Sequence, residues 1–344
     1  MKYCCFLALV VSFAASADDI TPRVGVIEIY GAHKVSPDKI RKAMGAQEGS
    51  PLPSREDAED RIDKLPGVVA SRIEAACCEQ RRMILYVGIE EKDSPHFEFH
   101  SAPSGDVTLP PELVDKYHSF LDTVVDSIHS GIADEDLTSG YSLMADSQCR
   151  EIQQSFIPFV AGNLALVDRV LRESADPEQR ILAAYLLQYG PRGPHTSKII
   201  VDALQYALQD QEDSVRQNAM RSLKAVAVGA KLHPDQQIRI EPTWFIELMN
   251  SVVWSDRHNA SLALVELTES RNPDTLSLLR QRALDSVIEM ARWHDLQHAL
   301  PAFILAGRLA GLEEKQIQDA WVAGNREPVL EKALHPNKKV KLSE

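Results

Sequence analysis

Long apolar runs and positive charge are both scarce in this sequence, and each shortage excludes a class of protein. A membrane-spanning helix needs about 20 predominantly apolar residues, and no stretch is that long, so we expect no membrane span. Lys and Arg number 37 against 50 Asp and Glu, which leaves a formal net charge of −13. Because a general nucleic-acid-binding protein carries a basic surface, this balance excludes nucleic acid as the expected partner.

Cysteine is scarce as well, with five residues in a chain of 344. Cys4 and Cys5 belong to the N-terminal stretch, which leaves Cys77, Cys78 and Cys149 as disulfide candidates. Three cysteines are too few for a disulfide-stapled fold, and no spacing among them is typical of a zinc site. Neighbours on a strand point to opposite faces, so either Cys77 or Cys78 could pair with Cys149. Small buried side chains are the simpler expectation.

The N-terminus has the three parts of a secretory signal peptide. Lys2 is the only charged residue before Asp18, the segment from Cys4 to Val11 is apolar, and Ala15-Ser16-Ala17 is a small-x-small cleavage site. We therefore expect residues 1–17 to be removed after Ala17. The mature protein would then work outside the cytoplasm, as a periplasmic or secreted protein.

Residues 20–92 predict a small α+β domain. Val24–Tyr30, Val68–Cys78 and Arg82–Glu90 are rich in β-branched or alternating apolar residues, which is typical of strands. Between the first two, helices are expected to begin at Ser36-Pro37 and at Ser54, because serine is a good N-cap and proline suits the first helical position. The predicted order is β-α-α-β-β.

This order resembles a POTRA domain over roughly residues 22–92. The segments that carry the resemblance are Ile29-Tyr30-Gly31, Ser36-Pro37-Asp38-Lys39-Ile40, Leu65-Pro66-Gly67-Val68 and Leu85-Tyr86-Val87-Gly88-Ile89-Glu90-Glu91. POTRA domains are small periplasmic modules of bacterial outer-membrane assembly and cell-division proteins. The resemblance implies a module that holds a partner, often by adding a strand to a sheet edge. An unrelated α+β domain is the alternative.

Residues 112–325 predict helices that recur at a fixed period. Leu113, Tyr117, Phe120, Val124 and Ile128 lie on one face of the first helix. Further on, an Arg stands three residues before an Ala near an acidic helix start, as in Arg180 with Ala183, Arg216 with Ala219 and Arg257 with Ala260, and Ala299 continues the register. The alanines recur at intervals of 36, 41 and 39 residues. An alanine at this place lets two helices approach closely.

The register resembles the HEAT-repeat family over roughly residues 155–325. The resemblance implies a mainly α fold, an α-α superhelix (solenoid) that presents an extended concave surface to proteins or peptides. Partner helices are expected at 196–208, 242–253, 273–291 and 313–322. An irregular helical bundle is the alternative. Residues 93–111, which are rich in proline, predict a linker that limits the angle between the two parts without fixing it, and residues 326–344 predict a tail.

One motif could carry chemistry. His294-Asp295-Leu296-Gln297-His298 resembles the zinc-protease pattern H-E-x-x-H with Asp in place of Glu. Histidines four apart on a helix share a face and could bind zinc. However, Asp is shorter than the usual base, and Pro301 is expected to disrupt a helix around Gln297. The repeat register also places a turn here, so we expect surface histidines and no metal.

These observations predict a non-catalytic interaction protein without a cofactor. It would be a scaffold or adaptor that binds a protein or peptide on the solenoid, and possibly at a sheet edge formed by Val24–Tyr30 or Val68–Cys78. The alternatives are a metallohydrolase that uses His294, Asp295 and His298, or an obligate structural subunit of an envelope complex, which a large exposed apolar patch would favour. The sequence does not indicate an oligomeric state.

Overall fold

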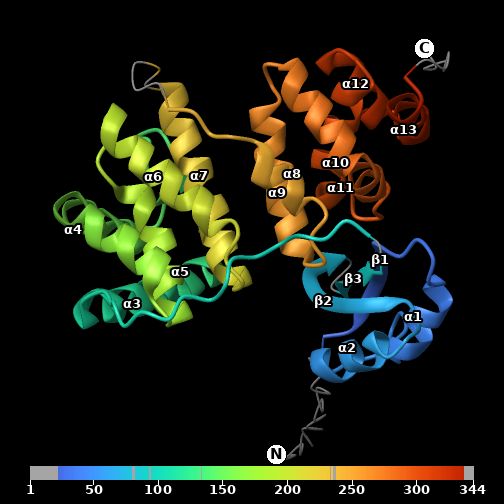
Figure 1. The fold of residues 1–344 in the computed structure, drawn as a ribbon, viewed down its shortest axis with the longest axis horizontal. Helices are drawn as coiled ribbons and strands as arrows, with labels where there is room; N and C mark the ends of the chain where they lie inside the picture. The colour runs from blue at the N-terminus through green and yellow to red at the C-terminus, as the bar shows by residue number, and fades with distance from the viewer. Residues whose placement is uncertain are drawn as a thin grey trace, which may run out of the picture.

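The computed structural model describes residues 22–79, 82–92, 94–132, 134–232, 234 and 238–336. The predicted signal peptide, residues 1–17, lies outside the described residues. The described part of the chain forms a three-stranded α+β domain followed by a helical superhelix, so the predicted fold class is confirmed (Figure 1). None of its helices has both the length and the apolar character that crossing a membrane requires.

The α+β domain has the predicted element order. β1 and β2 form the two edges of the described sheet, and β3 lies between them, parallel to β1 and antiparallel to β2. α1 and α2 cover one face, where Ile40, Met44 and Ile62 are fully buried. The elements are β1 (Val24–Tyr30), α1 (Pro37–Met44), α2 (Arg55–Asp63), β2 (Val68–Glu79) and β3 (Arg82–Glu91).

The second face of the sheet is also buried. Leu85, Val87 and Ile89 of β3 point towards α1 and α2, whereas Ile84 and Tyr86 belong to the core of the superhelix. Successive residues of a strand face opposite sides, so a strand with apolar residues at both alternations must be covered twice. The α+β domain therefore shares a hydrophobic core with the helices.

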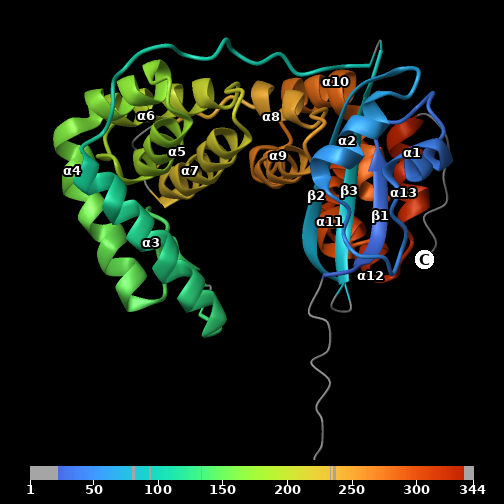
Figure 2. The same cartoon turned by 90° about the horizontal axis from the view of Figure 1, so that it is seen from below.

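The superhelix is built from two layers of helices. In one layer α5, α7, α9, α11 and α13 contact one another in chain order, and in the other α6 contacts α4 and α10 contacts α8. Figure 2 shows the resulting arch, with α3 and α4 at one end and the α+β domain at the other. The helices are α3 (Pro111–His129), α4 (Ser147–Glu173), α5 (Pro177–Leu186), α6 (Pro194–Ala207), α7 (Asp213–Leu232), α8 (Thr243–Leu248), α9 (Trp254–Leu267), α10 (Pro273–Ala291), α11 (Leu296–Leu309), α12 (Glu314–Val322) and α13 (Arg326–Leu334).

Two details of the helical region differ from the expectation. Residues 326–334 form α13 and are not part of a tail, because Val329, Leu330 and Ala333 are spaced to share a helical face and are buried against neighbouring helices. Between α3 and α4 the chain also forms a short hairpin from β4 (Glu135–Asp136) and β5 (Leu143–Met144). This hairpin contributes to the inner side of the arch.

The predicted linker is not a free spacer. Its residues 94–110, here called the strap, run extended from the α+β domain back along the superhelix to α3 (Figures 1 and 2). The backbone N–H of His100 donates to the backbone carbonyl of Gln209 at 2.8 Å, and the backbone N–H of Gly105 donates to the backbone carbonyl of Glu173 at 2.8 Å. The guanidinium carbon of Arg216 lies over the Phe99 ring, 4.6 Å from the ring centroid. The strap thus has partners on successive repeats, and the adjustable angle between the two parts stays a prediction.

The α+β domain docks on the C-terminal half of the arch through its sheet. Tyr86 stacks on Trp254 of α9 with ring centroids 4.6 Å apart, and the Tyr30 hydroxyl donates to the carbonyl of Val252 at 2.8 Å. The Glu74 carboxylate accepts from the N–H and hydroxyl of Ser255, both at 2.9 Å. Aromatic stacking with satisfied polar groups gives this contact one defined geometry.

Candidate functional site

The histidine motif lies where the α+β domain meets the superhelix. Asp295 is the N-cap of α11 and accepts from the N–H of His298 at 2.9 Å. The Nδ1 of His298 is hydrogen-bonded to the Tyr86 hydroxyl at 2.7 Å, and burial lowers the pKa of this imidazole. His294 is exposed, and its backbone N–H donates to Glu28 of β1. Asp295 and His298 are thus engaged in a helix cap and a domain contact.

The helix that follows the motif is longer than expected. The turn ends at Asp295, and α11 continues through Pro301 as far as Leu309. The expectation that Pro301 disrupts a helix around Gln297 is wrong, because α11 runs from Leu296 to Leu309 with Pro301 inside it. Pro301 removes only the helical hydrogen bond to the carbonyl of Gln297. Among the described residues, no group of three or more His, Cys, Asp or Glu side chains is placed to bind a metal ion.

The cysteines take different states. Cys149, at the start of α4, is free and fully buried, and burial raises the pKa of its thiol to about 11. It therefore behaves as a small core side chain at neutral pH, and the pairing considered for it is wrong. Cys77 on β2 is bonded in a disulfide, and the side chain of Cys78 lies outside the described residues.

The arginines of the repeat signature hold neighbouring repeats together. Arg216 is 1% exposed and donates to both the Asp256 carboxylate of the next repeat and the Asp210 carbonyl of the preceding turn. Arg180 makes the equivalent pair of contacts, to the Asp210 carboxylate and the Ser174 carbonyl. The alanines of the signature are fully buried, and they are Ala183, Ala219, Ala260 and Ala299. Arg257 is 3% exposed. The signature residues are therefore structural, and a ligand could not reach them.

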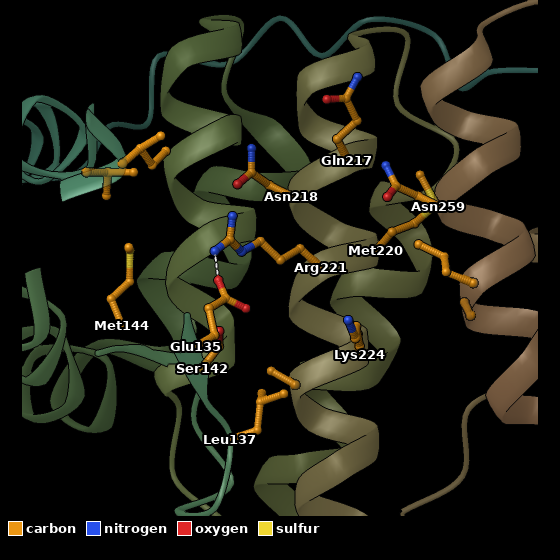
Figure 3. A pocket seen from close by; sticks show the side chains of 15 residues that line it. Glu135, Leu137, Ser142, Met144, Gln217, Asn218, Met220, Arg221, Lys224 and Asn259 are labelled. Atoms are coloured by element: carbon orange, nitrogen blue, oxygen red, sulfur yellow. Dashed lines mark hydrogen bonds and ion pairs between the residues drawn. The ribbon is translucent and has the colours of Figure 1, made fainter. Parts of the chain in front are cut away.

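A broad groove opens on the inner side of the arch between α3, the β4–β5 hairpin, α7 and α9 (Figure 3). Its volume is about 550 Å³, within the roughly 300–1,000 Å³ of ligand sites. We call it the concave groove. It is lined by Val124, Ile128, Glu135, Leu137, Ser142, Met144, Gln217, Asn218, Met220, Arg221, Lys224, Ala225, Asn259, Leu262 and Ala263.

Two asparagines occupy equivalent positions on the floor of the groove. Asn218 and Asn259 directly precede Ala219 and Ala260, so the repeat places them at the same point of α7 and α9. Both are half-buried, and Figure 3 shows them on the two adjacent helices. They were not predicted from the sequence, although their register with the alanines is the signal that would have found them.

Exposed apolar side chains form the rim of the groove. Ile128 on α3 is 53% exposed, and Leu262 on α9 is 38% exposed. Ile128 was expected on the buried face of its helix, but α3 turns it, together with Val124, towards the groove. Soluble proteins usually keep such side chains scattered, so their convergence on one hollow indicates a binding surface.

Charged side chains stand on the α7 side of the groove. Arg221 forms an ion pair with Glu135 of the β4–β5 hairpin (Figure 3). Lys224, one helical turn further along α7, is exposed and makes no ion pair with any described residue. The described groove therefore combines an apolar rim, three amide side chains (Gln217, Asn218 and Asn259) and the cation of Lys224.

No family model matches this chain, and the comparison with curated proteins gave no match. Solved structures with similar helices include two engineered proteins, each 18% identical. One covers 56% of this chain and 91% of its own with a TM-score of 0.36, and the other 56% and 93% with a TM-score of 0.34. A designed armadillo repeat protein is 14% identical and covers 66% of this chain and 97% of its own, with a TM-score of 0.35. At these values the likeness adds nothing to the helix packing described above.

Proposed function

We propose that this protein is an exported, non-catalytic scaffold that binds a segment of another protein in the concave groove. The observation that supports this most strongly is the convergence of exposed apolar side chains from α3 and α9 around three amides and Lys224, which has no ion pair with a described residue. Proteins usually bind their ligands in concave sites that combine an apolar lining with a few polar groups. A stacked superhelix holds such a site on rigid elements.

The finer assignments are part of the same proposal. We propose that the superhelix is of the HEAT type, supported by the buried signature residues at repeat spacing, and that the α+β domain is POTRA-like, supported by its strand order with both helices on one face. Export with cleavage after Ala17 is supported by the tripartite N-terminus. N-terminal sequencing of the exported protein should therefore begin at Asp18, and a start at Met1 would refute the cleavage.

Binding is preferred to catalysis because the only motif with a chemical pattern is already used by the fold. A zinc ion on His298 through Nδ1 would have to displace the Tyr86 hydroxyl, which anchors the α+β domain. Nor do the groove residues include an imidazole or thiol that could act as a nucleophile or base. The groove is suited to hold a partner.

The proposal is tested by capture of partners from the protein's own cells with a groove variant. Leu262→Glu places a charge in the apolar rim, where it would be buried by a bound partner at a cost of a few kcal/mol. Val322→Glu makes the same change on α12, outside the groove, where the side chain is 79% exposed. Proteins recovered with the native chain and identified by mass spectrometry should be lost with Leu262→Glu and retained with Val322→Glu. Equal recovery with both variants would place the binding surface elsewhere.

A further inference from the structure

The helix α7 lies across the middle of the concave groove. Figures 2 and 3 show it between α3 and the β4–β5 hairpin on one side and α9 on the other. The exposed apolar rim is divided between these two sides, because Ile128 belongs to α3 and Leu262 belongs to α9. A partner segment that buries both rim side chains must therefore cross α7 and cover the side chains that α7 presents to the groove.

The charges that line the groove differ in sign from the protein as a whole. The chain has a formal net charge of −13, whereas the charged lining residues are two cations, Arg221 and Lys224, and one anion, Glu135. Glu135 is already in an ion pair with Arg221. Lys224 has no ion pair with a described residue, so a partner can supply its counter-ion. Because salt screens exposed charges beyond about 8 Å at physiological ionic strength, this local cation decides which charge the groove attracts.

A partner that crosses α7 changes what the Lys224 ammonium needs. The side chain is exposed, so water solvates its charge in the protein alone. A bound segment removes part of this water, and a charge buried without a partner is costly. The lining amides of Gln217, Asn218 and Asn259 both donate and accept hydrogen bonds, so they favour neither sign of charge. A carboxylate offsets the cost best, because a hydrogen bond between two charged groups is stronger than one between neutral groups.

We infer that the segment held in the concave groove carries an aspartate or glutamate side chain between apolar residues, and that its carboxylate pairs with Lys224. This inference rests on the proposed function and specifies the chemistry of the partner. The apolar residues lie against Ile128 and Leu262, on the two sides of α7, and the carboxylate lies where the segment crosses α7. The carboxylate belongs to a side chain and not to a chain end, because the segment continues to the rim on both sides.

Displayed peptides are an unbiased probe of this inference with the full exported chain. Random segments of about 12 residues, which span about 40 Å when extended, are fused at both ends so that none has a free carboxyl terminus. They are selected in parallel on the native chain and on Lys224→Glu. The native chain should enrich segments with Asp or Glu flanked by apolar residues. Lys224→Glu should enrich segments with Lys or Arg in that place, because the preferred charge follows the charge of the groove.

The enriched segments are then made as synthetic peptides with blocked ends, each with an amide form in which Gln replaces Glu or Asn replaces Asp. Fluorescence anisotropy at low salt should show that the acid form binds the native chain about fivefold more tightly than the amide form, as an ion pair near the surface implies. Lys224→Met keeps an apolar stem but removes the charge, so both forms should bind it equally. Lys315→Glu on α12, where the lysine is 82% exposed, is the control and should keep the fivefold difference.

Two results would overturn the inference. One is a selection on the native chain that does not enrich Asp or Glu, including a selection that enriches no peptide. The other is a preference for the acid form that persists in Lys224→Met, which would place the carboxylate on another group. Failure of the proposed function is a different result, namely capture of the cellular partner that survives Leu262→Glu. If capture depends on Leu262 while the peptides show no role for Lys224, the groove is the binding site but its partner places no carboxylate on α7.

Discussion

At the scale of single residues, the contact between the α+β domain and the superhelix depends on a small cluster of aromatic and imidazole rings. His258 stacks on Trp254 at 5.2 Å between ring centroids, and the His298 ring lies 5.0 Å from that of His258. Tyr86 completes the cluster from the sheet. The sequence showed these histidines only as part of a zinc-like pattern or as scattered residues, because their partners are distant along the chain.

This cluster predicts that stability falls in mild acid. Burial, with a smaller effect of His298, lowers the pKa of His258 to about 4, although Asp295 acts in the opposite direction. The unfolded chain, with a histidine pKa of about 6.5, therefore binds more protons between pH 6.5 and pH 4. The contribution of neutral His258 is complete above that window and is lost as the pH falls through it, by up to about 3 kcal/mol.

Urea unfolding at pH 7 and pH 4.5 measures this effect. His258→Phe preserves a ring against Trp254 but cannot take up a proton, so its unfolding free energy should fall less between the two pH values than that of the native chain. The carboxylates titrate in both proteins and cancel in the comparison. The same pH dependence in both would mean that His258 is not held neutral by the fold.

At the scale of elements, the repeat pattern predicted the helices better than it predicted their surroundings. Residues 273–291 were expected as a helix and form α10, because an Asn-Pro start and a helical apolar period act locally. The docked strap was not foreseen, since its contacts with α6 and α7 join residues about a hundred apart. The contribution of α3 to the groove was not foreseen either, because Ile128 has the same periodicity as the buried side chains of α3.

The docked sheet predicts a sharp effect of one glycine. A Cβ atom on Gly88 of β3 would lie 1.9 Å from the Val252 carbonyl oxygen and 2.7 Å from the Tyr30 hydroxyl. Gly88→Val should therefore separate the α+β domain from α9 without requiring either part to unfold. The loss of Tyr86–Trp254 stacking should change tryptophan fluorescence, and amide exchange should rise at residues 252–255.

A matched control is available on α4. A Cβ atom added to Gly162 would meet no atom within 4 Å beyond its chain neighbours and the adjacent backbone of its own helix, so Gly162→Val should leave the fluorescence and the exchange at residues 252–255 unchanged. Native exchange in Gly88→Val would show that the sheet does not rest on α9 as described.

At the scale of the whole molecule, the strap and the docked domain connect the two ends of the arch. The α+β domain sits on the C-terminal half of the superhelix, and the chain returns from it to α3 before the repeats start (Figures 1 and 2). An open superhelix can flex along its length, whereas contacts between its ends restrict that motion. The arch therefore holds the concave groove, between α3 and α9, at a defined width.

The central claim is that the concave groove is where a partner protein binds, and site-specific photo-crosslinking in the protein's own cells tests it most directly. A photoreactive residue is placed at Ile128 or Leu262, which line the groove, or at Val322 on α12, one position at a time. The account predicts that both groove positions crosslink to the same protein and that Val322 does not. A crosslinked partner obtained from Val322 alone, or different partners from Ile128 and Leu262, would contradict it.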